Sequence, residues 1–253
     1  MIVTGAASGI GRACAELLAA GEHRMLLADR DAAGLAEVAG TIGEAAATAV
    51  VDLLDPDCGE RVVQAAVERM GGVDAVVSNA GIITAGALVD QGTADFERVF
   101  AINARATWAI GRAAHPHLKE SRGAFVATAS MSATQPTPGL GFYSASKAAL
   151  VMLVRQMSVE WGPDGIRCNT VSPGPTQTPM TAVGYADAER RRQREANIAL
   201  RKLGTAEDVA RAILFLLSPA AGHITGIDVL VDGGMSNMLM PASGGGTGQR
   251  ASA

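Results

Sequence analysis

The chain has 253 residues and a formal net charge of −4, with 48% hydrophobic and 18% charged residues. This hydrophobic fraction excludes a disordered chain, and the acidic balance argues against nucleic acid as a partner, because nucleic-acid-binding domains carry a basic surface. The length suits one α/β domain with a large buried core. No apolar run reaches the roughly 18 residues that a membrane span needs, so we expect no membrane partner.

The start of the chain and its cysteines suggest a cellular location. Cys14, Cys58 and Cys168 are far apart and form no Cys-x-x-Cys pair, which indicates reduced thiols in a cytoplasmic protein. An apolar run follows Met1 directly and leaves no room for a signal peptide. Because Met1 lies inside the first predicted strand, we expect either that the natural start lies upstream or that the protein tolerates a shortened strand.

Short apolar runs alternate with longer amphipathic stretches along the chain. The short runs are aliphatic, as is typical of strands covered on both faces. They predict strands at Met1–Thr4, Arg24–Ala28, Thr48–Val51, Ala75–Val77, Ala124–Ala129, Arg167–Val171 and Ile227–Val231. The amphipathic stretches predict helices at Ile10–Ala20, Ala32–Ile42, Asp57–Met70, Ala94–Leu118, Gly141–Trp161 and Ala206–Leu217. This order predicts a single-domain, doubly wound Rossmann fold, a parallel seven-stranded sheet with helices on both faces.

Two segments depart from this alternation. Residues 178–203 form the least regular interior part, and we expect a mobile segment there that covers the substrate. The run Arg190, Arg191, Arg192 and Arg194 lies among acidic residues, which favours a solvated mixed-charge helix; the alternative is that one arginine binds an acidic substrate group. We expect one domain over residues 1–236 and a polar, disordered tail over 237–253.

A glycine-rich turn joins the first strand to the first helix. Residues 4–11 read Thr-Gly-Ala-Ala-Ser-Gly-Ile-Gly, and these glycines allow a tight turn and close approach of the backbone to phosphate. The free N–H groups at the start of the helix favour a pyrophosphate. The turn therefore predicts a dinucleotide site, with a turn that binds no ligand as the alternative. Its members are Gly5, Ser8, Gly9, Ile10 and Gly11.

Residues at the ends of the next strands extend this site. A carboxylate at Asp29 can accept hydrogen bonds from the adenosine ribose and repel a 2′-phosphate, which favours NAD over NADP. Arg30 weakens this preference, because a basic side chain there can accept the phosphate. Asp52 can reach the adenine amino group, and Leu53 can cover the ring. The small residues after the fourth strand let backbone lie against the ribose: Asn79, Ala80 and Gly81.

Tyr143 and Lys147 are four residues apart and share one face of a predicted helix. A free phenol has a pKa of about 10 and is a poor base at neutral pH. We expect the Lys147 ammonium to lower the pKa of Tyr143 and to bind the nicotinamide ribose. A Tyr/Lys pair on a helix surface, without a catalytic role, is the alternative.

Together these motifs resemble the short-chain dehydrogenase/reductase family. The glycine turn, Asn79-Ala80-Gly81, Tyr143-x-x-x-Lys147 and Ser172-Pro173-Gly174 stand in the family's order and spacing, and the resemblance extends to about Ser236. It implies that Ser130 hydrogen-bonds the substrate oxygen beside Tyr143 and that Asn103 holds a water bridging to Lys147. It also implies a loop that holds nicotinamide, with Pro173, Gly174, Thr176 and Thr178.

The resemblance implies an oxidoreductase that transfers a hydride between NAD(H) and a secondary alcohol or ketone, with Tyr143 as general acid/base. Homotetramers, or homodimers, are the expected assembly. Two alternatives remain: an NADP-dependent 3-oxoacyl-carrier-protein-type reductase, and a non-catalytic NAD-binding sensor. We expect no metal site, because His115 and His117 are two residues apart and do not share a helix face.

Overall fold

A computed structural model describes residues 1–238 of the chain. Within these residues, seven parallel strands form one sheet in the order β3-β2-β1-β4-β5-β6-β9. Their bounds are β1 Ile2–Thr4, β2 Met25–Asp29, β3 Ala46–Val50, β4 Ala75–Ser78, β5 Ala124–Thr128, β6 Arg167–Pro173 and β9 Asp228–Val231. The predicted doubly wound sheet is confirmed. Of the predicted tail, only the first two residues are described, and the remainder lies outside the described residues.

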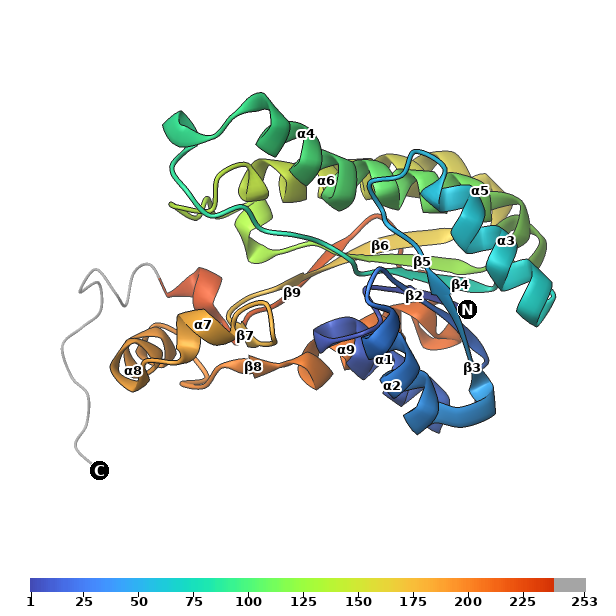
Figure 1. Ribbon diagram of the computed structural model, residues 1–253, viewed down its shortest axis with the longest axis horizontal. Helices are drawn as coiled ribbons and strands as arrows, with labels where there is room; N and C mark the ends of the chain where they lie inside the picture. The colour runs from blue at the N-terminus through green and yellow to red at the C-terminus, as the bar shows by residue number, and fades with distance from the viewer. Residues whose placement is uncertain (239–253) are drawn as a thin grey trace.

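Helices cover both faces of the sheet (Figure 1). One layer holds α1 Gly9–Ala20, α2 Ala32–Ile42 and α9 Ala206–Leu217. The other holds α3 Cys58–Met70, α4 Thr93–Phe100, α5 Ala106–Ser121 and α6 Tyr143–Trp161. The strand residues alternate between two hydrophobic clusters: Ile2 and Phe125 face the α3–α5–α6 layer, whereas Val3 and Val126 face the α1–α9 layer. Both faces need apolar side chains, which explains why these strands have no polar face.

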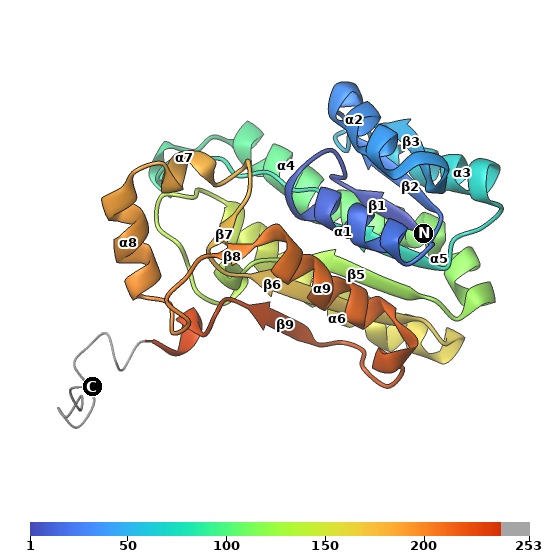
Figure 2. The same cartoon turned by 90° about the horizontal axis from the view of Figure 1, so that it is seen from below.

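The order of the strands places the ligand-binding edge. The chain runs outward from β1 to β2 and β3, then returns to pair β4 with β1 on its other side, so the winding reverses between these two strands. Parallel strands end at the same edge, and ligands of such sheets bind where the winding reverses. The segment after β6 lies beyond this edge, with α7 Ala182–Tyr185 and α8 Ala188–Ala196 (Figure 2).

The predicted helix Ala94–Leu118 is interrupted in the structure. α4 and α5 are joined by a π-helical turn, Ala101–Arg105, in which the Ala106 N–H donates to the Ala101 carbonyl. Hydrophobic periodicity does not separate a π turn from an α-helix, because one wide turn shifts the apolar face by only one residue. The turn contains the buried Asn103.

The segment 178–203 is more regular than expected. It contains α7 and α8 and is bracketed by a small parallel pair, β7 Thr176–Gln177 and β8 Gly204–Thr205. The helix at the arginine run is confirmed: ion pairs join Arg191 to Glu195 (3.0 Å) and Arg192 to Glu189 (2.8 Å). No residue of α8 is buried, so the sequence offers no apolar stripe there to mark a helix. The predicted mobility stays a prediction.

The amino-terminal strand is short but paired on both sides. β1 pairs with β2 and β4, and the Met1 ammonium donates to the Arg24 carbonyl at 3.0 Å. The Met1 carbonyl accepts from the Leu26 N–H at 2.9 Å, which continues the β1–β2 ladder to the first residue. Across residues 1–238, no helix has both the length and the apolar character to cross a membrane.

The contact between α3 and α5 generates a test of packing. A Cβ added at Gly59 would lie 2.4 Å from backbone atoms of Ala109, whereas one added at Gly40 on α2 would meet nothing within 4 Å. We expect Gly59→Ala to destabilise the fold by about 1–3 kcal/mol through overpacking. Gly40→Ala is expected to stabilise it by up to about 1 kcal/mol, through helix propensity. Urea unfolding measures both, and equal effects would contradict the packing described.

Candidate active site

The glycine turn has the geometry that a phosphate-binding loop requires. Gly5 and Gly9 have φ angles of +64° and +56°, which disfavour a side chain. A Cβ added at Gly11 would lie 2.1 Å from the Gly5 carbonyl oxygen, so α1 starts directly against the turn. Ser8 precedes α1 and, within the described part of the chain, its side chain makes no capping hydrogen bond. Backbone N–H groups therefore dominate this end of α1, and Ile10 lies in its first turn.

Asp29 is held in place at the end of β2. Its carboxylate oxygens accept hydrogen bonds from the N–H groups of Ala7 and Asp31, each at 3.1 Å. These bonds tie β2 to the glycine turn and hold a negative charge at the edge of the sheet. Arg30, the neighbouring residue, is exposed.

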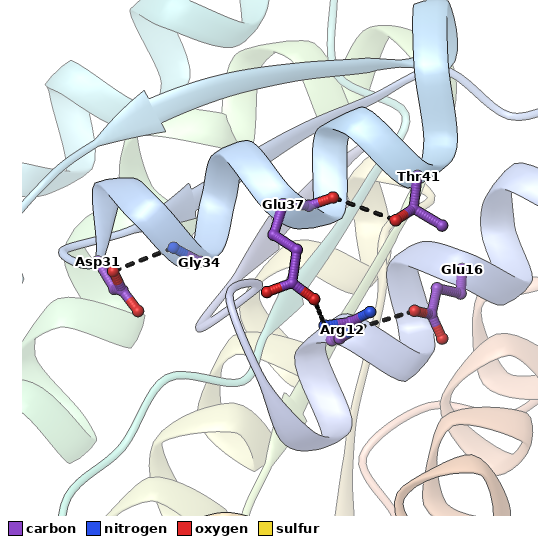
Figure 3. Close-up of polar contacts among 6 residues, drawn as sticks. All are labelled: Arg12, Glu16, Asp31, Gly34, Glu37 and Thr41. Atoms are coloured by element: carbon purple, nitrogen blue, oxygen red, sulfur yellow. Dashed lines mark hydrogen bonds and ion pairs between the residues drawn. The ribbon is translucent and has the colours of Figure 1, made fainter.

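Further acidic side chains lie on and beside α2, which the sequence analysis did not single out: Asp31 at its start, Glu37 midway along it and Glu16 on the neighbouring α1 (Figure 3). Asp31 caps α2, and its carboxylate accepts from the N–H groups of Ala33 and Gly34 at 3.1 Å. Arg12 on α1 lies between two carboxylates, Glu16 at 2.8 Å and Glu37 at 2.6 Å. A capping pattern, an acidic residue just before an apolar helix, was the signal for Asp31.

Asp52 and Leu53 lie beyond β3, which ends at Val50. The Asp52 carboxylate accepts from the Leu54 N–H at 2.9 Å, and Leu53 packs against the hydrophobic cluster under α3. Both residues therefore lie at the carboxyl edge of the sheet. Their contact with adenine stays a prediction.

Asn79 joins the ends of three strands. Its amide nitrogen donates to the Thr4 carbonyl on β1 at 3.2 Å, and its amide oxygen accepts from the Thr128 hydroxyl on β5 at 3.0 Å. The Thr4 hydroxyl in turn accepts from the N–H groups of Asn79 (3.0 Å) and Ala80 (3.2 Å). Thr4 is fully buried, and its place before the first glycine was the only signal for this role.

The side chains of Ser130, Tyr143 and Lys147 come together beside β5. Tyr143 is the first residue of α6, and its phenol lies close enough to the Ser130 hydroxyl for that group to lower its pKa. Lys147 lies one turn later and is buried; its ammonium donates to the Thr128 carbonyl at 2.8 Å. The Lys147 Nζ atom is 5.8 Å from the centroid of the Tyr143 ring. The Ser130 hydroxyl also accepts from the Ser132 N–H at 3.1 Å, which fixes its position.

Burial sets the pKa values of this pair. Burial raises the pKa of Tyr143, and the hydrogen bond with Ser130 opposes that rise. Burial also lowers the pKa of Lys147 to about 8. The expectation that Lys147 lowers the pKa of Tyr143 is wrong for the protein alone. The ammonium donates to the Thr128 carbonyl, and desolvation of the phenol is the largest cause of the upward shift.

Asn103 is buried in the π turn. Its amide oxygen accepts from the Ile82 N–H at 2.8 Å, and its amide nitrogen donates to the Ile82 carbonyl at 3.0 Å and to the Ser146 hydroxyl at 2.9 Å. A Cβ added at Gly81 would lie 3.2 Å from both the Asn103 Oδ1 and the Lys147 Nζ atoms. Asn103 and Lys147 therefore approach the same glycine, and π turns occur frequently at functional sites.

The loop after β6 faces the glycine turn. Pro173 ends β6 and Gly174 follows it; Thr176 is buried in β7. A Cβ added at Gly9 would lie 3.5 Å from the Thr178 Cβ, so the loop and the turn are in van der Waals reach. Thr181, which the sequence analysis missed, holds this loop. Its hydroxyl donates to the Thr176 carbonyl at 2.6 Å and accepts from the Thr178 N–H at 3.0 Å.

A hollow of about 460 Å³ opens beside this loop and is lined by Gln177, Thr178, Pro179, Ala182 and Tyr185.

Away from the candidate site, His115 contacts Asp164 at 3.0 Å and packs edge-on against Trp161 at 5.0 Å. No group of three or more His, Cys, Asp or Glu residues within 1–238 is arranged to hold a metal ion.

The doubly wound sheet, the glycine turn and the Ser–Tyr–Lys cluster define a dinucleotide-binding protein with a titratable phenol at its carboxyl edge. Residues 5–236 match the family described as enoyl-(acyl carrier protein) reductase. The chain is 36% identical to L-rhamnose 1-dehydrogenase (NAD(P)(+)) of Azotobacter vinelandii, over 93% of this chain and 95% of that protein.

Solved structures agree with this match. A short-chain dehydrogenase/reductase of Brucella melitensis, named glucose/ribitol dehydrogenase, superposes with a TM-score of 0.88 at 37% identity, over 92% of this chain and 95% of that one. A 3-ketoacyl-(acyl-carrier-protein) reductase of the same organism, complexed with NADH, superposes with a TM-score of 0.86 at 32% identity, over 93% and 97%.

The chain belongs to the short-chain dehydrogenase/reductase family. It is an NAD(P)-dependent oxidoreductase that acts on CH–OH groups of a small-molecule substrate, and its tightly packed glycine turn fits a dinucleotide.

The buried amine of Lys147 generates a test of pH-dependent stability. Its pKa falls from 10.5 to about 8 on folding, so the unfolded chain binds more protons between these values. The free energy of unfolding therefore rises with pH between about 8 and 10.5. We expect this rise to disappear in Lys147→Met and to persist in Lys202→Met, whose side chain is exposed. Urea unfolding at several pH values measures it, and an unchanged rise in Lys147→Met would contradict the assignment.

Proposed function

We propose that Tyr143 is the general acid/base of a hydride transfer between NAD(H) and a secondary alcohol or ketone, with Ser130, Lys147 and Asn103 as its partners. The observation that carries this proposal is the meeting of Ser130, the Tyr143 phenol and the buried Lys147 ammonium at the carboxyl edge of the sheet, next to Gly81. NAD supplies the hydride acceptor at its nicotinamide ring. Every other element of the chemistry falls to side chains of the chain.

In the oxidative direction, Tyr143 as phenolate accepts the alcohol proton, and in reduction it returns a proton to the carbonyl oxygen. Ser130 accepts from the Ser132 N–H through its oxygen, and in this proposal its one hydroxyl hydrogen turns from the phenol to the substrate oxygen. Two fixed partners orient that oxygen and polarise the C–O bond. A substrate and a positive nicotinamide ring would each change the environment that raises the pKa of Tyr143 in the protein alone.

Lys147 and Asn103 complete the proton path of the proposal. The ammonium has hydrogens to spare beyond its bond to the Thr128 carbonyl, and these are available to the nicotinamide ribose. Both amide hydrogens of Asn103 are used, by the Ile82 carbonyl and the Ser146 hydroxyl. We therefore assign water binding to the oxygen atoms of Asn103, its side-chain Oδ1 and its backbone carbonyl. Gly81 keeps the space between the two residues free of a side chain.

We propose NAD as the preferred cofactor. Asp29 presents a fixed carboxylate at the end of β2, and Asp31 adds a second charge at the start of α2. The α2 N–H groups of Ala33 and Gly34 are already used by Asp31, and Arg12 is engaged by two glutamates. A 2′-phosphate thus meets negative charge, and these N–H and guanidinium donors are already engaged. Ser8, Gly9 and Gly11 are assigned to the pyrophosphate, and Asp52 and Leu53 to adenine.

A 3-oxoacyl-carrier-protein-type reductase using NADP is the second candidate. The exposed Arg30 supports it, and so does the likeness to a 3-ketoacyl-(acyl-carrier-protein) reductase. The neighbouring carboxylates oppose it. A non-catalytic NAD sensor is less favoured, because the chain presents a complete Ser–Tyr–Lys cluster.

We also propose a cytoplasmic homotetramer. Its three cysteines are free and buried, which suits a reducing compartment. Large apolar side chains are exposed on α6 (Met152 and Val159) and on the edge strand β9 (Leu230). Exposed apolar side chains on a helix face and an open sheet edge favour association with further copies.

Replacing the phenol tests the role of Tyr143. We expect Tyr143→Phe to lower kcat at least about 1,000-fold, because the proton acceptor is lost, while leaving the Kd for NADH within about twofold. Turnover is followed as NADH absorbance on a panel of secondary alcohols, sugars, steroids and acyl thioesters, and binding as NADH fluorescence. Near-normal turnover in the variant would remove Tyr143 from the mechanism.

Removing one charge tests the cofactor preference. We expect Asp29→Asn to raise the ratio of kcat/KM with NADP to that with NAD by about tenfold, because the carboxylate no longer repels the 2′-phosphate. Asp57→Asn, which makes the same charge change before α3, serves as the control and should leave the ratio unchanged. If the wild type already prefers NADP, the proposed preference is wrong.

A further inference from the structure

The Ser146 hydroxyl links two parts of the site that are far apart in sequence. It accepts a hydrogen bond from the Asn103 amide at 2.9 Å and donates to the Tyr143 carbonyl at 2.7 Å. Ser146 is fully buried, so no solvent competes for either bond. A hydroxyl has one hydrogen, and its use on Tyr143 leaves the oxygen to accept from Asn103.

This link lies at the start of α6, where the Tyr143 N–H also donates to the Leu140 carbonyl at 3.1 Å. Tyr143 is the first residue of α6, and Phe142 before it makes no side-chain capping hydrogen bond within the described part of the chain. The first turn of a helix has N–H groups without intrahelical partners and frays easily when it is not capped. Tyr143 opens this first turn, and Lys147 is the first residue after it.

The other end of the link is rigid. Asn103 is buried in the π turn and exchanges two further hydrogen bonds with the backbone of Ile82, in the segment that follows β4. Through the Asn103 side chain, Ser146 therefore connects the start of α6 to the segment that follows β4. The same segment contains Gly81, which approaches both Asn103 and Lys147.

We propose that Ser146 is a positioning residue of the active site, whose hydroxyl ties the start of α6 to Asn103 and so fixes the phenol of Tyr143 and the ammonium of Lys147. Ser146 touches neither substrate nor cofactor in this role. It acts by holding the peptide of Tyr143 and by orienting the Asn103 amide, whose nitrogen faces two acceptors. The inference rests on the proposed role of Tyr143 and adds a residue that positions it.

The helix itself provides a matched control. Ser158 is also buried on α6, and its hydroxyl also donates to the carbonyl three residues earlier, Arg155, at 2.7 Å. The two serines share the same local bond, but Ser146 alone of the pair accepts from Asn103. Ser146→Ala and Ser158→Ala therefore remove the same helix contact, and only the first removes the link to the π turn.

Steady-state kinetics give the first test. We expect Ser146→Ala to lower kcat about 10- to 100-fold, because the reacting groups lose their alignment, with the Kd for NADH within about twofold. Ser158→Ala should keep the wild-type kcat. Ser146→Thr, which restores a hydroxyl, should recover activity relative to alanine. Equal kcat values for the two alanine variants would overturn the proposal.

Tyrosinate absorbance gives a second test that needs no substrate. The chain has two tyrosines, so in a Tyr185→Phe background the titration reports Tyr143 alone. Lys147, on the same helix, lies against its ring and has a pKa of about 8, so it is neutral in this range, and the neutral Ser130 hydroxyl faces it from the segment after β5. Burial raises the pKa of Tyr143, so a loosened phenol should titrate closer to the ordinary value of 10.0.

We expect this downward shift in Ser146→Ala and no shift in Ser158→Ala. Identical titrations of the two alanine variants would overturn the inference. A lack of turnover on every alcohol tested would instead count against the proposed function. If an alanine variant does not fold, the pair Ser146→Cys and Ser158→Cys replaces it. A thiol keeps the volume but is a weak hydrogen-bond partner, so the same difference is expected.

Discussion

A buried amine determines much of how the carboxyl edge of this sheet is built. Lys147 is almost fully buried, and moving an ammonium out of water is costly unless polar groups receive it. The end of β5 meets this requirement, because the Thr128 carbonyl accepts from Nζ where the strand ends and its ladder leaves the carbonyl available. The facing position 81 favours glycine, since a Cβ there would lie 3.2 Å from the amine and push it aside by a few tenths of an ångström.

The remaining polar groups of this edge form a network of two hydrogen-bonded sets. Asn79 joins β1, β4 and β5, and Thr128 takes part twice, with its hydroxyl on Asn79 and its carbonyl on Lys147. In the second set, Asn103 and Ser146 tie the segment after β4 to the start of α6. Buried polar groups are costly when unpaired and rigid when fully paired, so this network both requires and maintains a single arrangement. Such rigidity suits groups that must meet a reacting oxygen within a fraction of an ångström.

The end of β2 and the start of α2, which we propose for the adenosine, are built on charge rather than on burial. Asp29 and Asp31 use backbone N–H groups to hold two carboxylates near the glycine turn, and glutamates occupy Arg12. These side chains are partly exposed, so their mutual effect is screened by water and salt. In the proposed preference for NAD, a 2′-phosphate is disfavoured because local donors are already used, as well as by repulsion.

The sequence alone determined the sheet, both helical layers and the main candidate residues, because strands buried on both faces leave unbroken aliphatic runs and because glycine turns and the Tyr-x-x-x-Lys spacing are local patterns. Tertiary structure decided the rest. The π turn around Asn103, the bridging roles of Ser146, Thr4 and Thr181, and the upward pKa shift of Tyr143 depend on partners distant in sequence. Burial and hydrogen-bond partners are properties of packed neighbours, and no single-sequence pattern encodes which neighbours meet.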